Sequence, residues 1–279
     1  MALKLEYMDS RVFASLEPFD PAWLAERDDW ERYTEALFRA NGLPWQPTDS
    51  NVDQWLQAPD RASFLHMAGE LLPELQAGRD LSRVALVIVA HWTPDLHLGT
   101  SVSNFLLHEL GLTKALGFAI SERGLSAPLF AVDCAARYLQ LGQQALVLVA
   151  DQKHLLYRSP AFDPSAVSNS ASMLLLEQSG PGRPLAGYRR QLRGQGESLA
   201  HSLGLLLAQL PEWPVGATLV ADPATLAASG WTGPRRATDP ARLCSAPFAA
   251  LGGCHGPALL LQADAQALYG LAVGAVSCM

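Results

Sequence analysis

The chain has 279 residues, of which 49% are hydrophobic and 17% charged, and its formal net charge is −7. This composition suits one large buried core or two fused halves and argues against a disordered protein. The negative charge offers no basic surface for nucleic acid, and the longest apolar runs are too short to span a bilayer. Its four cysteines form no CxxC pair, and the N-terminus has no apolar signal segment, so we expect a cytoplasmic protein.

The first part of the chain predicts a strand, two helices and a second strand. Residues 3–16 alternate loosely between apolar and polar side chains, as in a strand or hairpin. Residues 22–40 and 60–74 have apolar side chains at helical spacing. Residues 43–60 contain three prolines and two tryptophans and predict an ordered surface loop. Residues 84–90, VALVIVA, are apolar throughout, which is typical of a strand buried on both faces of a parallel sheet.

The central stretch continues with a helix near residues 100–110, a strand at 117–120, a polar turn, a helix ending near Leu139 and a strand at 145–150. This βαβαβ order predicts right-handed crossovers and a mostly parallel sheet. A turn from a strand into a buried helix is where many α/β enzymes present a nucleophile. Here the turn consists of Ser, Glu, Arg and Gly, and Ser126 follows two residues later, so the obvious nucleophile is missing.

The rest of the chain echoes the same order at reduced length. Pro181 to Pro184 is the best candidate linker, so we predict two halves, residues 1–184 and residues 185–279. The further predicted elements are strands at 167–177, 185–192, 217–221 and 271–277, helices at 196–210, 224–229 and 258–269, and a glycine-rich turn at 252–256.

Taken together, these segments resemble the thiolase fold, and within it the β-ketoacyl-acyl-carrier-protein synthase III group. The resemblance implies an α/β protein of two related βαβαβ halves in five layers, α-β-α-β-α, with the second half shortened. The segments that carry it are VALVIVAHWTPD (84–95), residues 117–139 with ALVLVAD (145–151), residues 168–177, LVADPATLAAS (219–229) and LGGCHGPALLL (251–261).

Enzymes of that group use a Cys to take the acyl chain, with a His and an Asn to stabilise the developing oxyanion. The resemblance places the Cys position at Gly124, the His at Asp222, the Asn of the same motif at Thr225 and the second-turn Asn at Gly253. An Asp would repel an oxyanion instead of donating a hydrogen bond to it. We therefore expect no catalytic residues of that kind, and we expect neither a cofactor nor a metal ion.

Other reactive side chains have plainer explanations. Cys134 lies in the central predicted helix, where a small buried apolar residue is the simplest interpretation. Cys254 and His255 are adjacent, so their side chains would point apart in an extended segment. His91 and His97 flank the loop after the strand at 84–90, but the sequence supplies no evident partners for metal ligation.

Two functions follow from the resemblance. The first is a non-catalytic subunit of a heteromeric ketosynthase III-like condensing enzyme in fatty-acid- or polyketide-derived secondary metabolite biosynthesis. Its partner would be a homologue with an intact Cys, His and Asn, in a heterodimer or heterotetramer, and acyl carrier protein or acyl-CoA would engage that partner. Chain-length-factor-like subunits and the small subunit of the alkylquinolone-forming heterodimer are examples. The alternative is a stand-alone acyltransferase or cyclase with a non-standard site near Ser126 or Asp222.

The resemblance also implies where a partner would bind, because in that group the strand at 145–151 lies at the sheet edge and pairs with its counterpart. It contains no Lys or Pro of the kind that protects an exposed edge, which favours a covering partner. The interface residues expected are Ala145, Leu146, Val147, Leu148, Val149, Ala150 and Asp151.

Overall fold

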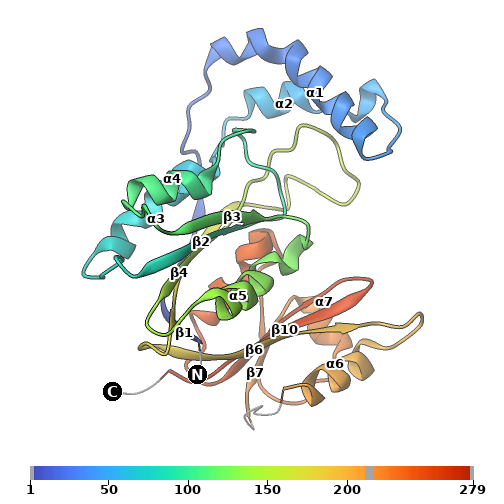
Figure 1. The fold of residues 1–279 in the computed structure, drawn as a ribbon. Helices are drawn as coiled ribbons and strands as arrows, with labels where there is room; N and C mark the ends of the chain where they lie inside the picture. Colours follow the sequence, from blue (N-terminus) through green and yellow to red (C-terminus); the bar gives the residue numbers. More distant parts are fainter. Residues whose placement is uncertain (1–2, 211–215, 277–279) are drawn as a thin grey trace.

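The computed structural model describes residues 3–210 and 216–276. Its strands form one continuous mixed sheet in the order β3-β2-β4-β5-β1-β6-β10-β9-β7-β8 (Figure 1). The strands are β1 Leu3–Phe13, β2 Val84–Ala90, β3 Leu116–Ile120, β4 Gln144–Asp151, β5 Asn169–Gln178, β6 Arg183–Leu192, β7 Thr218–Ala221, β8 Arg235–Ala237, β9 Ala258–Ala263 and β10 Ala267–Val273. The helices are α1 Arg27–Ala40, α2 Val52–Gln57, α3 Phe64–Gln76, α4 Val102–Glu109, α5 Ala127–Tyr138, α6 Leu199–Ala208, α7 Pro223–Ala228 and α8 Ala246–Leu251. Short 3-10 helices are η1 Pro21–Glu26, η2 Pro47–Asp49, η3 Gly124–Ser126 and η4 Pro240–Ser245.

The sheet is built from two halves with the same strand order. The first half has the order β3-β2-β4-β5-β1, with the third strand of that half at the outer end and the first at the centre of the sheet. The second half has the matching order β8-β7-β9-β10-β6 when it is read from its own outer end. The halves join where β1 pairs antiparallel with β6, beginning at Leu3 and Leu185. The predicted pair of related halves is confirmed, while the boundary between residues 184 and 185 stays a prediction.

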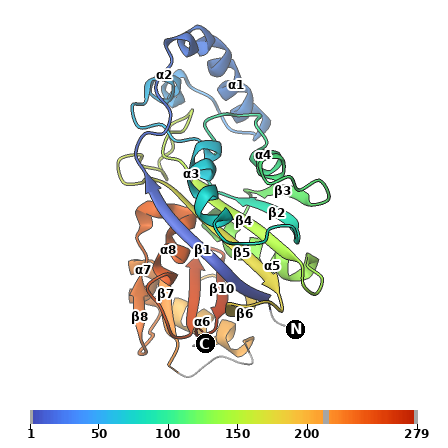
Figure 2. The same ribbon diagram turned by 90° about the vertical axis from the view of Figure 1, so that its left-hand side faces the viewer.

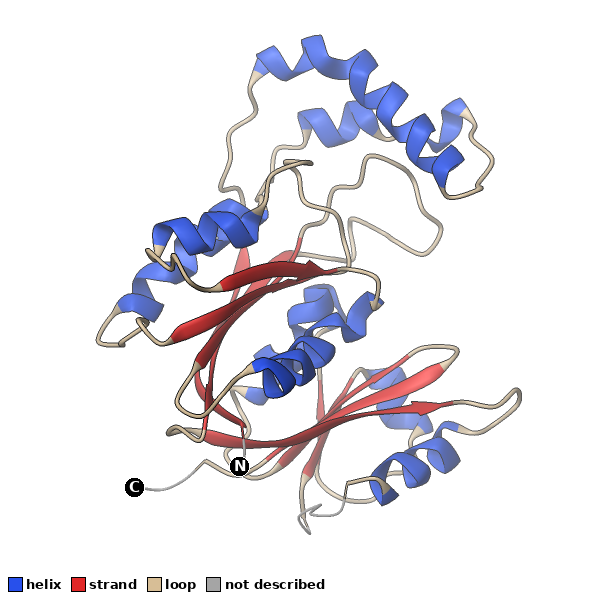
Figure 3. Ribbon diagram, in the orientation of Figure 1, coloured by secondary structure: helices blue, strands red, loops and turns tan. Residues whose placement is uncertain are grey.

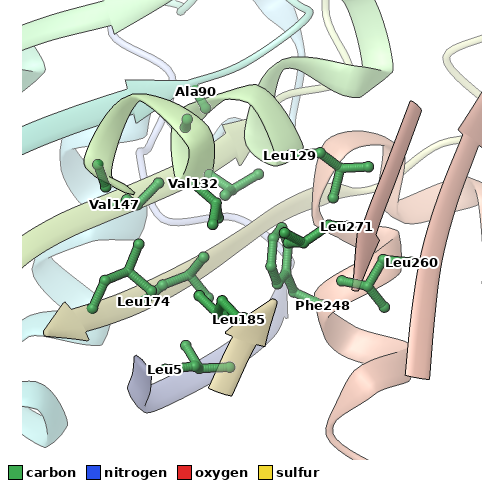
Figure 4. Close-up of a cluster of buried hydrophobic side chains, with 14 of the residues drawn as sticks. Leu5, Ala90, Leu129, Val132, Val147, Leu174, Leu185, Phe248, Leu260 and Leu271 are labelled. Carbon is green, nitrogen blue, oxygen red and sulfur yellow. The ribbon is translucent and has the colours of Figure 1, made fainter. Parts of the chain in front are cut away.

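Helices cover both halves and fill the space between them, which gives the five predicted layers (Figures 1 and 3). α3 and α4 pack on the outer face of the first half, and α6 and α7 on the outer face of the second. α5 and α8 lie between the halves. Their side chains, among them Leu129 and Phe248, meet Val147, Leu174 and Leu271 of the strands in one apolar cluster (Figure 4). Burial of this cluster is the main source of stability for the region that holds the site.

A helical cap, residues 21–57, stands away from the sheet at one end of the molecule (Figure 2). Its core is aromatic: Trp30 and Trp55 meet edge to face at 5.1 Å, and the buried Arg61 guanidinium lies 4.4 Å from the ring centre of Trp23. The segment 43–60, expected to be a loop, contains α2, because the buried Trp55 and Leu56 anchor that turn of helix.

Two predictions about the sheet are wrong. Residues 258–269 are not a helix but β9, a turn beginning at Asp264, and the start of β10. Strand β4 is not an edge strand, because it pairs with β2 on one side and β5 on the other and is buried along its whole length. Its backbone groups are already engaged, so residues 145–151 cannot add a partner strand. The open end of the first half is β3, whose single partner among residues 3–210 and 216–276 is β2.

Within residues 3–210 and 216–276, no helix has the length and apolar character needed to cross a membrane.

Candidate functional site: two facing helix turns

The turn between β3 and α5 is where the sequence places the missing nucleophile. Gly124 begins η3 with φ of +54°, which favours glycine, and a Cβ there would meet no atom within 4 Å. Ser126 is buried, and its Oγ donates a hydrogen bond to Arg123 O at 2.8 Å. The turn therefore has room beside Gly124, but its hydroxyl is already used to hold the turn together.

A second turn of the same construction precedes α8. Residues 242–247, RLCSAP, share Arg, Ser, Ala and Pro with residues 123–128, RGLSAP. Leu243 stands in the place of Gly124 and also has a positive φ, +46°, which is uncommon for a leucine. η3 and η4 are in contact between the two halves of the sheet. The two turns thus face each other as equivalent parts of the repeated topology.

This repeat corrects one assignment. Gly253 was expected to hold the second-turn position, but it follows α8 instead of preceding it, and its carbonyl accepts a hydrogen bond from Arg236. The residue equivalent to Gly124 in the second half is Leu243. An apolar side chain there has no hydrogen bond to offer a reacting oxygen.

A thiol and a carboxylate occupy the contact between the turns. Cys244 is fully buried; its N–H donates to Asp151 Oδ2 at 2.9 Å, and its Sγ lies 3.7 Å from Gly124 O. Asp151, at the end of β4, also accepts hydrogen bonds at Oδ1 from the backbone N–H groups of Trp92 and Thr93, both at 2.8 Å. Burial raises the pKa of Asp151.

The same surroundings make the thiol unreactive. Burial, followed by the negative charge of Asp151, raises the pKa of Cys244 well above that of a free cysteine. Nucleophilic attack by cysteine needs the thiolate and an approach for the substrate. Cys244 has neither, so it acts as a packing residue beside the position that Gly124 leaves open.

Asp222, expected at the position of the His, caps a helix. It follows β7, and its Oδ1 accepts a hydrogen bond from Thr225 N at 3.0 Å, as an N-cap residue does. Thr225 is buried within α7. The two residues at the expected His and Asn positions are thus engaged with each other at the start of α7.

Cavities lie elsewhere. One of about 710 Å³ lies against β1 and the glycine turn before β6, and its lining includes Lys4, Arg79 and His255. Another, of about 230 Å³, lies beside β3 and is lined by residues that include His91 and Ala119. His91 Nδ1 lies 2.7 Å from Thr93 O, and the ring packs against Phe64. Neither lining includes a residue of η3 or η4.

The remaining cysteines fit the plainer explanation where they are described. Cys134 is partly buried on α5, and Cys254 is buried with Sγ 3.7 Å from Ala250 O in its own turn. His255 is exposed next to it. Cys278 lies outside the described residues.

No protein-family model matches the chain, and no curated protein matches it in sequence. Solved structures do match it over nearly its whole length. 3-Oxoacyl-(acyl carrier protein) synthase III, FabH, from Xanthomonas oryzae is 14% identical with a TM-score of 0.60, covering 98% of this chain and 99% of that one. A single-residue variant of OleA from Xanthomonas campestris gives the same values. ChlB3, described as an acyltransferase, is 13% identical with a TM-score of 0.59, covering 99% and 98%.

The chain has the thiolase fold. The FabH and OleA structures are thiolase-fold condensing enzymes, so the predicted resemblance is confirmed at the level of architecture. At 13–14% identity the likeness carries the fold alone and leaves the chemistry to the residues of this chain.

Proposed function

We propose that this chain is a non-catalytic subunit of a heteromeric ketosynthase III-like condensing enzyme, paired with a homologue that carries the active Cys, His and Asn. The observation that carries the proposal is the pair of turns. Gly124 provides no nucleophile, Ser126 is bound to Arg123 O, and Cys244 is a buried thiol with a raised pKa. The fold is retained while the reactive groups of a condensing site are replaced.

The hydrogen bonds of Asp151 also support a non-catalytic role. Asp151 ties the loop after β2 to the second turn by accepting hydrogen bonds from three backbone N–H groups. Such a network maintains the shape of the middle layer and needs no substrate. A subunit whose task is to hold an active partner in position requires that shape but not the chemistry. Fatty-acid- or polyketide-derived secondary metabolites are the product class in which we place the complex.

We place the partner contact at β3, the open end of the first half, because β4 lies inside the sheet. Leu116 and Ala119 are exposed on this strand, which has no Lys, Arg, Asp, Glu or Pro to discourage strand pairing. Addition of a homologous β3 would extend the sheet across both subunits. The acyl thioester, on coenzyme A or acyl carrier protein, would be bound by the partner.

The test is co-expression of the full chain with a homologous condensing subunit from the same genome, followed by size-exclusion chromatography and a condensation assay. We expect one complex, with activity that requires both chains. Ala119→Lys should abolish the complex, because it places charge on the strand edge. Ala237→Lys, on the exposed edge strand β8 at the other end of the sheet, is the matched control and should leave it intact. Equal activity of the partner with and without this chain would contradict the proposal.

A stand-alone acyltransferase or cyclase using Ser126 or Asp222 has less support, since both side chains are engaged in local hydrogen bonds. Intact-mass spectrometry of the purified chain with acyl-CoA separates the two functions. We expect no covalent acyl adduct, and an adduct that disappears in Ser126→Ala would favour the alternative.

A further inference from the structure

Three metal-ligating side chains from separate parts of the chain meet at the base of the helical cap. Glu17 lies on the segment that enters the cap, His66 in the first turn of α3 after the cap, and His97 in the loop between β2 and α4. Each offers one ligand atom, and these atoms all lie within 4.8 Å of one another. The sequence offered His97 as a candidate ligand without partners; Glu17 and His66 are far from it along the chain and form no motif with it.

Glu17 has an unpaired oxygen in a buried position. The residue is 6% exposed; its Oε1 lies 2.8 Å from His97 Nε2, but Oε2 has no hydrogen-bond partner among the described residues. The nearest cation on Oε1, Arg61, is 3.9 Å away and directs its guanidinium to the carbonyls of Trp55 and Leu56. A buried carboxylate oxygen without a partner is costly, so a ligand that binds it is physically expected.

The geometry around that oxygen suits a metal ion. His66 Nδ1 lies 3.6 Å from Glu17 Oε2; the same nitrogen is 2.8 Å from Ser63 Oγ, a hydrogen bond that a metal ion at Nδ1 would replace. Ligand atoms at about 2.0–2.1 Å from a tetrahedral ion lie about 3.3 Å apart. The 2.8 Å contact is made to Oε1 and the 3.6 Å contact to Oε2, and the three ligand atoms all lie within 4.8 Å of one another, so rotation of these side chains would bring them to that spacing.

We propose that Glu17, His66 and His97 bind a divalent first-row transition metal ion, with Zn²⁺ as the best-suited probe, and that the ion fastens the cap to the sheet. Two imidazoles and one carboxylate are ligands that select such an ion over Ca²⁺ or Mg²⁺. The ion links the segment entering the cap, the helix leaving it and a loop of the core. This inference is independent of the proposed condensing complex.

A second carboxylate and a guanidinium lie near the site. Asp95, two residues before His97, has a buried Oδ2 without a hydrogen-bond partner among the described residues. Arg61 is the opposing charge, held by its carbonyl contacts and the tryptophan rings. Because three protein ligands leave one tetrahedral position free, water or a small anion would complete the coordination.

The experiment uses the full chain, stripped with a chelator and dialysed. We expect one Zn²⁺ per chain by elemental analysis after gel filtration, and an increase in the unfolding temperature on adding ZnCl₂, because a ligand that binds only the folded state stabilises it. His66→Gln and His97→Gln should each weaken binding by about tenfold or more. Both side chains are partly exposed, so these variants are expected to fold.

The control is His201→Gln, which removes a histidine from a comparable contact, 3.2 Å from Glu197, outside the cluster. It should bind Zn²⁺ like the parent chain. Zn²⁺ should also slow proteolysis within residues 21–57 in the parent chain but not in the His66→Gln, His97→Gln double variant. Stoichiometric Zn²⁺ that persists in the double variant would place the ion elsewhere in the chain and overturn the site, as would absence of binding by the parent chain. Unchanged cap proteolysis on Zn²⁺ binding would overturn the fastening role.

Discussion

Replacing Asp151 with Asn tests whether the buried carboxylate holds the two turns together. The carboxylate accepts backbone hydrogen bonds on both oxygens: Oδ1 from Trp92 and Thr93, and Oδ2 from Cys244. Asn has almost the same shape but only one acceptor atom. If the Asn oxygen points toward Trp92 and Thr93, the Asn NH₂ group faces the backbone N–H of Cys244, which then has no acceptor. In the opposite orientation, the backbone N–H groups of Trp92 and Thr93 both lose their acceptor.

We estimate the loss of folding stability from the Asn orientation that leaves one backbone donor unpaired. One buried N–H left without an acceptor costs about 1–3 kcal/mol, and the bonds that remain become weaker because the acceptor is neutral. Against this, Asn removes the cost of burying a charge, the same cost that raises the pKa of Asp151. Three backbone donors converge on the carboxylate, so we expect the hydrogen-bond loss to dominate. The free energy of unfolding should fall by about 1–3 kcal/mol.

The assay is urea unfolding at pH 7, followed by circular dichroism. Asp264→Asn is the matched control. Its carboxylate also accepts two backbone N–H groups on Oδ1, and it accepts Tyr269 OH on Oδ2, but it lies in an exposed turn. Water can replace a lost bond there, so the control should change by less than about 1 kcal/mol. If Asp151→Asn is as stable as the parent chain or more stable, desolvation outweighs the network, and the view of Asp151 as the tie between the turns is wrong.

Three further outcomes are expected. Burial, opposed by Asp60, lowers the pKa of His154 below its ordinary value of 6.5. As the pH drops below about 6.5, His154 is therefore protonated in the unfolded chain before the folded one, and the free energy of unfolding falls. Urea titrations of His154→Gln should show a smaller fall over the same pH range. In a Cys278→Ser background, a thiol reagent should modify Cys134 in the native protein and Cys244 only after unfolding; prompt native labelling of Cys244 would contradict its burial. Leu129→Ala should lower the free energy of unfolding by about 2–5 kcal/mol, since Leu129 is fully buried between the halves, and a loss below about 1 kcal/mol would show that the middle layer is loosely packed.

The sequence was most informative where local pattern and burial agree. The apolar run at 84–90 is β2 residue for residue, and the run at 145–150 is the centre of β4. The order of such segments predicted a βαβαβ arrangement, and the family resemblance extended it to the thiolase fold. The segment 258–269 failed because its Leu and Ala residues suit a helix as well as a strand. The two strands form because β9 and β10 pair with each other, β10 also with β6 and β9 also with β7; the turn at Asp264 was the local signal that was missed.

The candidate site was harder to predict, because its contacts join distant segments. The edge position of β3 and the interior position of β4 depend on sheet order, which periodicity does not contain. The second turn could have been found from the repeated Arg-x-x-Ser-Ala-Pro segment, which places Leu243 opposite Gly124. Glu17, His66 and His97 had no such signal, since no motif spacing relates them.

The two turns and the group of three metal-ligating side chains lie in different parts of the structure. The turns lie in the middle layer, where Asp151 and Cys244 hold a fixed arrangement that no substrate needs to enter. The cluster lies at the base of the cap, beside the loop that also carries His91 and close to the open edge at β3. A metal ion there would order the cap and the loop at once, and with them one flank of the surface on which we place the partner.

Loss of Zn²⁺ should then weaken the complex without any change at the turns, whereas Ala119→Lys should abolish it with Zn²⁺ still bound. Measuring complex formation in the His66→Gln, His97→Gln variant and metal content in Ala119→Lys therefore separates the two roles. A complex that assembles equally well without the ion would confine the metal site to the cap.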